Sequence, residues 1–90
     1  MNSTQLLHAS IEKLFLSLLS IGSEKWSPED IGYVKEIVVH GEYEDALQNL
    51  IAIAKIKNYK IDDKEIKLIN EMAELMGIRN EINLGEIVSS

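Results

Sequence analysis

Apolar residues recur at every third or fourth position through four stretches of this chain, and each stretch ends at a glycine or a polar turn. That spacing places them on one face of an α-helix. No stretch alternates apolar and polar residues between hairpin turn signals, as β-strands would. The pattern therefore predicts an all-α fold, a small bundle of four helices whose short connections favour antiparallel neighbours.

The expected helices span about residues 4–21, 28–40 and 42–57, with a fourth from 62 or 63 to 77. Each carries an apolar stripe that we expect to be buried. In the first helix the stripe is Leu7, Ile11, Leu14, Leu18 and Ile21, widened by Phe15 and Leu19. In the later helices it is Ile31, Val34, Ile37 and Val38; Tyr43, Ala46, Leu47, Leu50, Ile51 and Ala54; and Ile66, Ile69, Met72, Ala73 and Met76.

Two of the helices have clear start signals. In the run Ser27–Asp30, the serine can cap free amide groups, and the proline fits a first helical position, where no N–H is needed. Asp62 and Glu65 have the spacing of a capping box. Gly41 and Gly77 are expected to end the preceding helices, because glycine readily adopts the left-handed conformation of a C-cap.

The last dozen residues are harder to assign. Ile82, Ile87 and Val88 are compatible with a short fifth helix at the C-terminus that packs on the bundle. No interdomain linker, repeat or low-complexity tract interrupts the 90 residues. A chain of this length forms one domain, so we expect residues 1–90 to fold as a single helical unit.

The residues that catalysis or metal binding would need are missing or scattered. The chain has no cysteine, which excludes disulfides, Cys-ligated zinc and a Cys nucleophile. His8 and His40 lie far apart, as an expected surface residue and an expected helix end, and neither belongs to an H-E-x-x-H motif. Adjacent acidic residues are better explained by helix N-termini than by acid–base chemistry. The sequence therefore predicts no enzyme activity, no cofactor and no metal site.

Negative charge is concentrated in the middle of the chain. The net charge is −6, which argues against direct nucleic-acid binding. Residues 23–50 contain seven acidic residues against two lysines, whereas residues 51–70 contain five lysines against three acidic residues. A solvated acidic surface explains this pattern, and so does a patch that steers a basic partner. The residues of the expected patch are Glu29, Asp30, Glu36, Glu42, Glu44 and Asp45.

Aromatic residues add a second element to that surface. Trp26 precedes the Ser27 cap and either packs against Asp30 and Ile31 as a hydrophobic staple or serves as an exposed anchor. Tyr33 and Tyr59 are expected to be exposed, so Tyr33 is the other candidate anchor.

The Leu-rich stretch from Leu6 to Ile21 does not indicate a leader or a membrane span. No Lys or Arg precedes it, and Glu12 and Lys13 interrupt it. It is also too short and too polar to cross a bilayer. We therefore expect a cytoplasmic protein with no membrane partner.

The run from Val39 to Leu47 reads VHGEYEDAL, and the later segment from Ile61 to Ile78 has its apolar residues at Ile61, Ile66, Ile69, Met72, Ala73, Leu75, Met76 and Ile78. In these two segments the chain resembles the MafI-type family of bacterial immunity proteins, and related small helical immunity proteins of contact-dependent inhibition systems. The likeness covers about residues 31–78, more than half of the chain. Its most specific part is the HGEY run.

The resemblance implies an immunity protein that binds and neutralises a cognate toxin domain, often a nuclease, inside the cell that makes it. Such a partner is expected to be basic, because a nuclease must hold phosphates. A monomer in a one-to-one complex is favoured, with the acidic patch and Trp26 or Tyr33 in contact with the toxin.

A second hypothesis needs no toxin. The helix expected over residues 4–21 has apolar residues on more than one side, since Leu6, Phe15 and Leu19 widen its stripe. A regulatory or scaffolding module that dimerises through this helix would also bury them. The oligomeric state of the pure protein distinguishes the two hypotheses.

Overall fold

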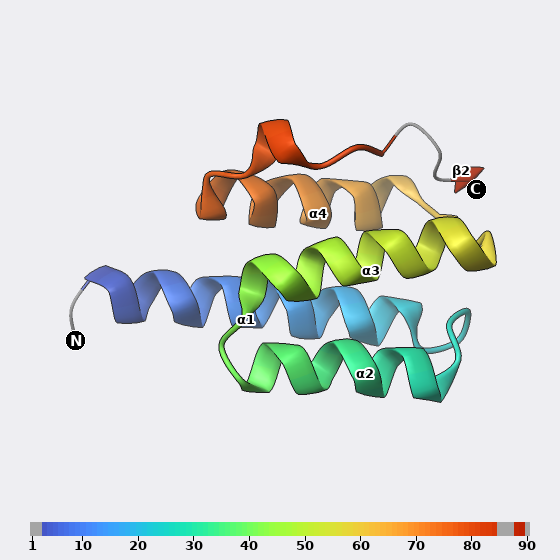
Figure 1. Ribbon diagram of the computed structural model, residues 1–90, viewed down its shortest axis with the longest axis horizontal. Helices are drawn as coiled ribbons and strands as arrows, with labels where there is room; N and C mark the ends of the chain where they lie inside the picture. Colours follow the sequence, from blue (N-terminus) through green and yellow to red (C-terminus); the bar gives the residue numbers. More distant parts are fainter. Residues whose placement is uncertain (1–2, 85–87, 90) are drawn as a thin grey trace.

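The computed structural model describes residues 3–84 and 88–89 as a bundle of four helices (Figure 1). These are α1 (Ser3–Gly22), α2 (Pro28–Val39), α3 (Tyr43–Lys57) and α4 (Asp63–Met76). Their ends fall within two residues of those expected from the spacing of apolar residues. The prediction of an all-α four-helix bundle is confirmed.

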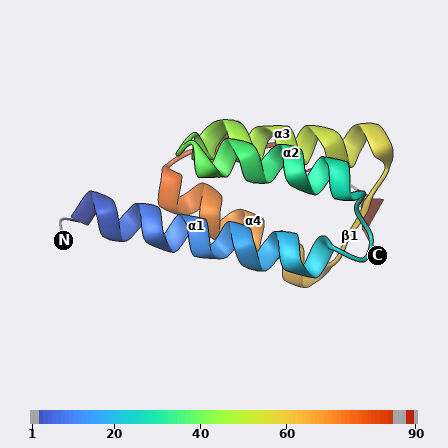
Figure 2. The same ribbon diagram turned by 90° about the horizontal axis from the view of Figure 1, so that it is seen from below.

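The helices form two antiparallel pairs. Helix α1 packs mainly against α4, and α2 packs mainly against α3, so the bundle consists of two layers (Figure 2). The second pair joins consecutive helices through a short turn, whereas the first pair brings together the two ends of the chain's helical part. Helix α3 also contacts α4, and α1 contacts α2, which closes the bundle.

Local hydrogen bonds set the helix ends as the sequence indicates. The Asp30 N–H donates to Ser27 Oγ at 3.1 Å. In the capping box, the Glu65 N–H donates to Asp62 Oδ1 at 2.9 Å and the Asp62 N–H donates to Glu65 Oε1 at 3.1 Å. Helix α4 ends at Gly77, whose φ of 71° is in the left-handed region. Both predicted helix starts are confirmed.

The core is built from aliphatic residues of all four helices, with Phe15 and Trp26 as its fully buried aromatics. The predicted stripes of α3 and α4 face it. Its buried residues are Ile11, Phe15, Leu18, Leu19, Trp26, Val34, Val38, Ala46, Leu47, Leu50, Ile51, Ala54, Ile61, Ile69, Met72, Ala73 and Ile78.

The predicted stripe of α1 is wrong at both of its ends. Leu7 and Ile21 are exposed, and Phe15 and Leu19 take the central buried positions. One reason is length: at 20 residues α1 is ~30 Å long, whereas the 14 residues of α4 span only ~21 Å. The first turns of α1 therefore extend beyond the bundle (Figure 1), and no described part of the chain covers Leu7 completely.

The C-terminal segment is not a fifth α-helix in the part that the structure describes. After Gly77, the buried side chain of Ile78 holds the chain against the bundle, and Arg79–Glu81 form a single 3-10 turn, η1. Strand β2 (Val88–Ser89) then pairs in parallel with β1 (Lys60–Ile61) over two residues. Ile82 is half-buried, and Ile87 lies outside the described residues. No helix in the described part of the chain is long and apolar enough to cross a bilayer.

Candidate functional site

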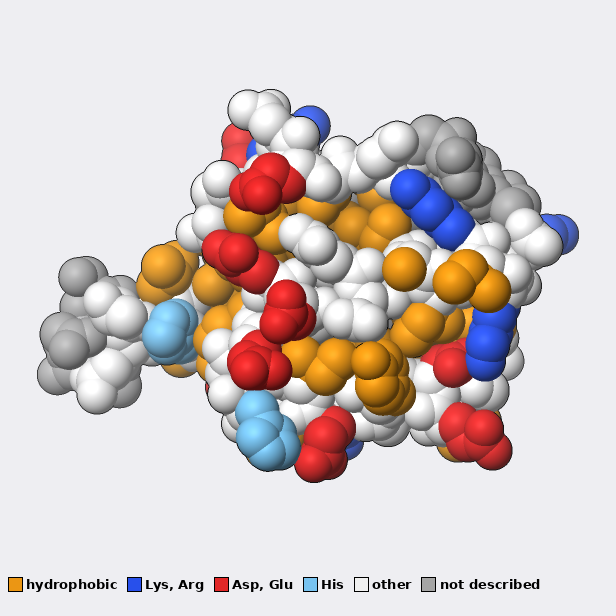
Figure 3. All heavy atoms as spheres, in the orientation of Figure 1, with side chains coloured by type: hydrophobic (Ala, Val, Ile, Leu, Met, Phe, Trp, Pro, Cys, Tyr) orange, Lys and Arg blue, Asp and Glu red, His pale blue; other side chains and the backbone are white. Residues whose placement is uncertain are grey.

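A groove of about 450 Å³ lies where the first turns of α1, the turn between α2 and α3, and the end of α4 meet. Its apolar lining is Leu7, Ile11, Tyr43, Leu75 and Met76. Its polar lining is His8, Gly41, Glu42, Glu44 and Asp45. On the face seen in Figure 3, acidic side chains gather around the start of α3 with hydrophobic ones beside them. We call this feature the acidic groove.

The acidic groove exists because two antiparallel helices of unequal length end at different levels. Helix α1 continues past the last turn of α4, so Leu7 and Leu75 remain 37% and 41% exposed instead of covering each other. Apolar side chains of this size favour burial by about 1.5–3 kcal/mol each when fully covered. A partner that fills the groove would gain part of that free energy.

The charges at the rim have no counter-ion within the described chain. The ion pairs of residues 3–84 involve Lys25, Lys57 and Arg79, and none includes Glu42, Glu44 or Asp45. Glu42 occupies the N-cap position of α3, yet its side chain makes no capping hydrogen bond. Helix α4 has no basic residue in its last turn, so the partial negative charge of its C-terminus lies at the groove, whereas the N-terminus of α3 places partial positive charge beside Glu44 and Asp45. The ionised side chains of the rim therefore set its negative charge.

Aromatic rings form one wall of the groove. The ring of Tyr43 lies between His8, at a centroid distance of 5.2 Å, and Phe15, at 6.4 Å. The Tyr43 hydroxyl donates to Glu12 Oε2 at 3.4 Å. Burial raises the pKa of Tyr43, and the nearby charge of Glu12 raises it further, so the phenol stays protonated and neutral. Tyr43, a member of the predicted apolar stripe, is half-buried.

A separate polar cluster lies at the opposite end of α2, around Asp30. Lys57 Nζ contacts Asp30 Oδ1 at 2.8 Å and Oδ2 at 2.7 Å, and the Tyr59 hydroxyl donates to Oδ2 at 2.5 Å. The hydrogen bond from Lys57, followed by that from Tyr59, lowers the pKa of Asp30. The same contact with Asp30 raises the pKa of Lys57. These groups tie the start of α2 to the end of α3, which is a structural role.

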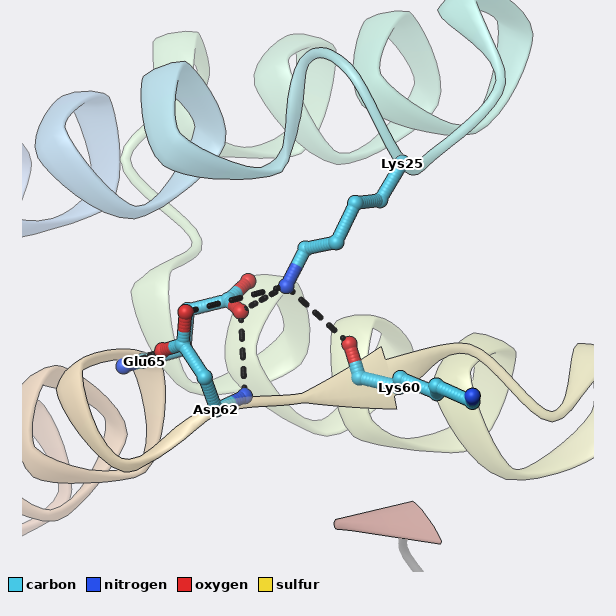
Figure 4. A network of polar contacts seen from close by, with 4 residues as sticks. All are labelled: Lys25, Lys60, Asp62 and Glu65. Atoms are coloured by element: carbon cyan, nitrogen blue, oxygen red, sulfur yellow. Dashed lines mark hydrogen bonds and ion pairs between the residues drawn. The ribbon is translucent and has the colours of Figure 1, made fainter. Parts of the chain in front are cut away.

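A second ion pair joins the loop after α1 to the start of α4 (Figure 4). Lys25 Nζ pairs with Glu65 Oε1, donates to the Lys60 carbonyl oxygen at 3.2 Å and lies 3.9 Å from Asp62 Oδ2. The Glu65 side chain is fully buried, and within the described residues its Oε2 has no hydrogen-bond partner. A buried carboxylate requires such a cation, so this pair also serves the fold.

The structure divides the eight predicted contact residues into three groups. Glu42, Glu44 and Asp45 come together at the acidic groove. Glu29, Tyr33 and Glu36 are exposed along α2, and Tyr33 is 53% exposed, as expected. Glu29 belongs to the first turn of α2, and this helix is ~18 Å long, so Glu29 lies far from the groove. The six predicted acidic residues therefore do not form one continuous patch.

Trp26 and Asp30 make up the third group, and both are buried, so the exposed-anchor alternative for Trp26 and the surface position expected for Asp30 are wrong. Trp26 is only 4% exposed, because its ring stacks on Tyr59 at a centroid distance of 5.1 Å and packs over Gly22. Asp30 is buried by its contacts with Lys57 and Tyr59. The expectation of an exposed Tyr59 is wrong for the same reason, since the stacking leaves it half-buried.

Several residues of the site could not be assigned from the sequence. His8 was expected at the surface and is exposed, but nothing in the sequence placed it beside Tyr43. Leu7 and Met76 belonged to stripes that predicted core positions. Among the described residues no group of three side chains is arranged to hold a metal ion.

Comparison of the chain with protein-family models, with curated proteins and with solved structures finds no match. The resemblance to immunity proteins therefore remains a prediction from the sequence.

Proposed function

We propose that this chain is a binding protein whose acidic groove docks a basic partner, and that the partner is a cognate toxin domain neutralised in the cytoplasm. The observation that carries the proposal is the combination of a partly exposed apolar lining with three carboxylates that have no ion-pair partner in the described chain. The toxin as the partner comes from the sequence resemblance.

The two parts of the groove would contribute differently to binding. Leu7 and Leu75 of the apolar lining supply affinity, because both are partly exposed in the free protein. The rim carboxylates supply on-rate and selectivity by attracting a positively charged surface. A nuclease presents such a surface where it holds phosphates, so an acidic inhibitor can compete with the nucleic acid. Inhibition of this kind needs no chemical step.

The test uses a toxin domain as the partner. The probe is a candidate toxin domain, the C-terminal domain of a large secreted protein where one is encoded beside this gene, and binding is measured by calorimetry at low and high salt. We expect one-to-one binding that weakens as salt rises, and rescue of cells that express the domain. Absence of both binding and rescue would rule out the toxin as partner.

Charge-reversal variants test the groove itself. Glu42→Lys/Asp45→Lys should slow association by at least about tenfold, because four units of charge change at the rim. The matched control is Glu24→Lys/Asp63→Lys, which makes the same change in net charge at two exposed positions outside the groove; Asp63, like Asp45, lies in a first helical turn. Equal effects of the two variants would show that net charge matters and the groove does not.

The dimer hypothesis has one observation in its favour. Leu6, Leu16 and Ile21 of α1 are exposed, and Leu16 borders a second hollow between α1 and α2. Sedimentation equilibrium of the pure protein tests it: a dimer that Leu6→Ser/Leu16→Ser converts to a monomer would support it. A monomer at all concentrations would eliminate it.

A further inference from the structure

We infer that the acidic groove receives a single arginine side chain from the surface of its partner. The guanidinium would lie between the rim carboxylates and the aromatic wall, with its methylene stem on the apolar lining. This inference rests on the proposed function and specifies the chemistry of the group that the groove binds.

The lining of the groove suits a long side chain with a charged end. Its volume of about 450 Å³ is larger than a lone ion needs and leaves room for such a side chain. Leu7, Leu75 and Met76 offer apolar surface along which an alkyl stem can pack, while the charge stays at the rim. An anionic or wholly apolar group would leave one half of this lining unmatched.

The charge at the rim calls for a cation that makes several hydrogen bonds at once. Glu42, Glu44 and Asp45 are exposed and without ion pairs in the described chain. A guanidinium offers five N–H donors in a planar fork, which suits neighbouring carboxylates better than the point charge of an ammonium.

The aromatic wall favours arginine over lysine for a second reason. The exposed ring of His8 lines the groove, with its centroid 5.2 Å from that of Tyr43, and planar guanidinium groups stack on aromatic rings. The chain itself cannot fill the site with arginine. Its single arginine, Arg79, lies 3.9 Å from Glu74 Oε1, and neither residue lines the groove.

The experiment does not require the partner. Isotope-labelled protein is titrated with N-acetyl-arginine methylamide and followed by NMR, with the lysine and citrulline counterparts as comparison probes. We expect the arginine probe to shift the backbone amides of residues 41–45 and the methyl groups of Leu7, Leu75 and Met76. The lysine probe should bind more weakly, and citrulline, which has the same shape without the charge, should produce no shifts.

Neutralising variants locate the site. Glu44→Gln/Asp45→Asn should weaken arginine binding roughly two- to five-fold for each carboxylate removed, as for other exposed ion pairs. The control Glu24→Gln/Asp63→Asn removes the same charge elsewhere and should leave binding unchanged. Equal binding of lysine and arginine, or equal effects of the two variants, would overturn the assignment of a guanidinium site.

The outcomes also separate this inference from the proposed function. If the arginine probe causes no shifts in the groove but the toxin domain binds with the expected salt dependence, the arginine assignment is wrong and the proposed function stands. If arginine binds in the groove but no toxin domain is captured, the site is real and the identity of the partner is wrong.

Discussion

Lys25, in the loop after α1, pairs with the fully buried carboxylate of Glu65 in the first turn of α4. The two residues are 40 positions apart in the sequence. Glu65 also belongs to the capping box with Asp62, so one carboxylate joins a helix start to a distant loop.

Removing the cation should therefore be more harmful than removing the pair. Lys25→Met should lower the free energy of unfolding by about 2–3 kcal/mol, because it leaves a buried carboxylate without a counter-ion. The decrease in stability is smaller than for a fully buried ion pair, because Lys25 is partly exposed. Urea unfolding followed by circular dichroism measures this. The double variant Lys25→Met/Glu65→Gln removes both charges and should recover part of the stability; a double variant less stable than Lys25→Met would contradict the role of the pair.

The contact between Asp30 and Lys57 predicts how stability depends on pH. The pKa of Asp30 is lowered from 3.8, so its contribution is fully present above pH 3.8 and is lost as the pH falls through the lowered value. Below pH 3.8, Asp30→Asn should make the free energy of unfolding depend less steeply on pH. Part of that dependence should remain, because the pKa of Asp62 is also lowered. The control is Asp63→Asn, which removes an exposed carboxyl group outside these contacts; equal effects of the two variants would contradict the role of Asp30. At alkaline pH the contribution of Lys57 is lost only as the pH rises through its raised pKa.

The Tyr59 hydroxyl can be tested without disturbing its ring. It donates to Asp30 and accepts the Ser27 N–H at 3.2 Å. Tyr59→Phe keeps the stacking on Trp26 and should lower the free energy of unfolding by about 1–2 kcal/mol, because two partly buried hydrogen bonds are lost. Tyr33→Phe is the matched control, since its exposed hydroxyl makes one bond of 3.3 Å to Asn49. Similar losses in the two variants, measured by thermal unfolding, would contradict the role of Tyr59.

Gly32 should be replaceable with a gain in stability. It lies in the middle of α2, and a Cβ added there would meet no atom within 4 Å beyond the adjoining backbone of its own helix. Gly32→Ala should raise the free energy of unfolding by roughly 0.5–1 kcal/mol, because alanine is the better helix former. Gly77→Ala is the contrasting variant and should destabilise, because Gly77 has a φ of 71°. Denaturant midpoints that move in the same direction for both variants would refute this account.

The features that could be predicted from the sequence are those that depend on residues close together in the chain. The cap at Ser27 and the capping box at Asp62 are fixed by side chains three residues from their partners, so both could be read directly. Contacts between residues far apart in the sequence leave no such local pattern. Nothing around Glu65 indicates that Lys25 neutralises it, and nothing around Trp26 indicates that Tyr59 stacks on it.

The candidate site shows the same division. Its acidic rim was predicted because Glu42, Glu44 and Asp45 are close in sequence. Its apolar lining was not, because Leu7 and Met76 lie on helical stripes that normally indicate core. Only the difference in length between α1 and α4 decides that they meet at an open end.

The extension of α1 past α4 has a consequence for local unfolding and for hydrogen exchange at this end of the molecule. Residues 4–10 are all exposed, so few buried contacts hold these first turns in helical form. Their amides should exchange with deuterium far sooner than those around Leu47, in the centre of the core. One side of the acidic groove can thus unwind while the remainder stays folded, and an occupant that orders it would be detected as slowed exchange at this end of the helix.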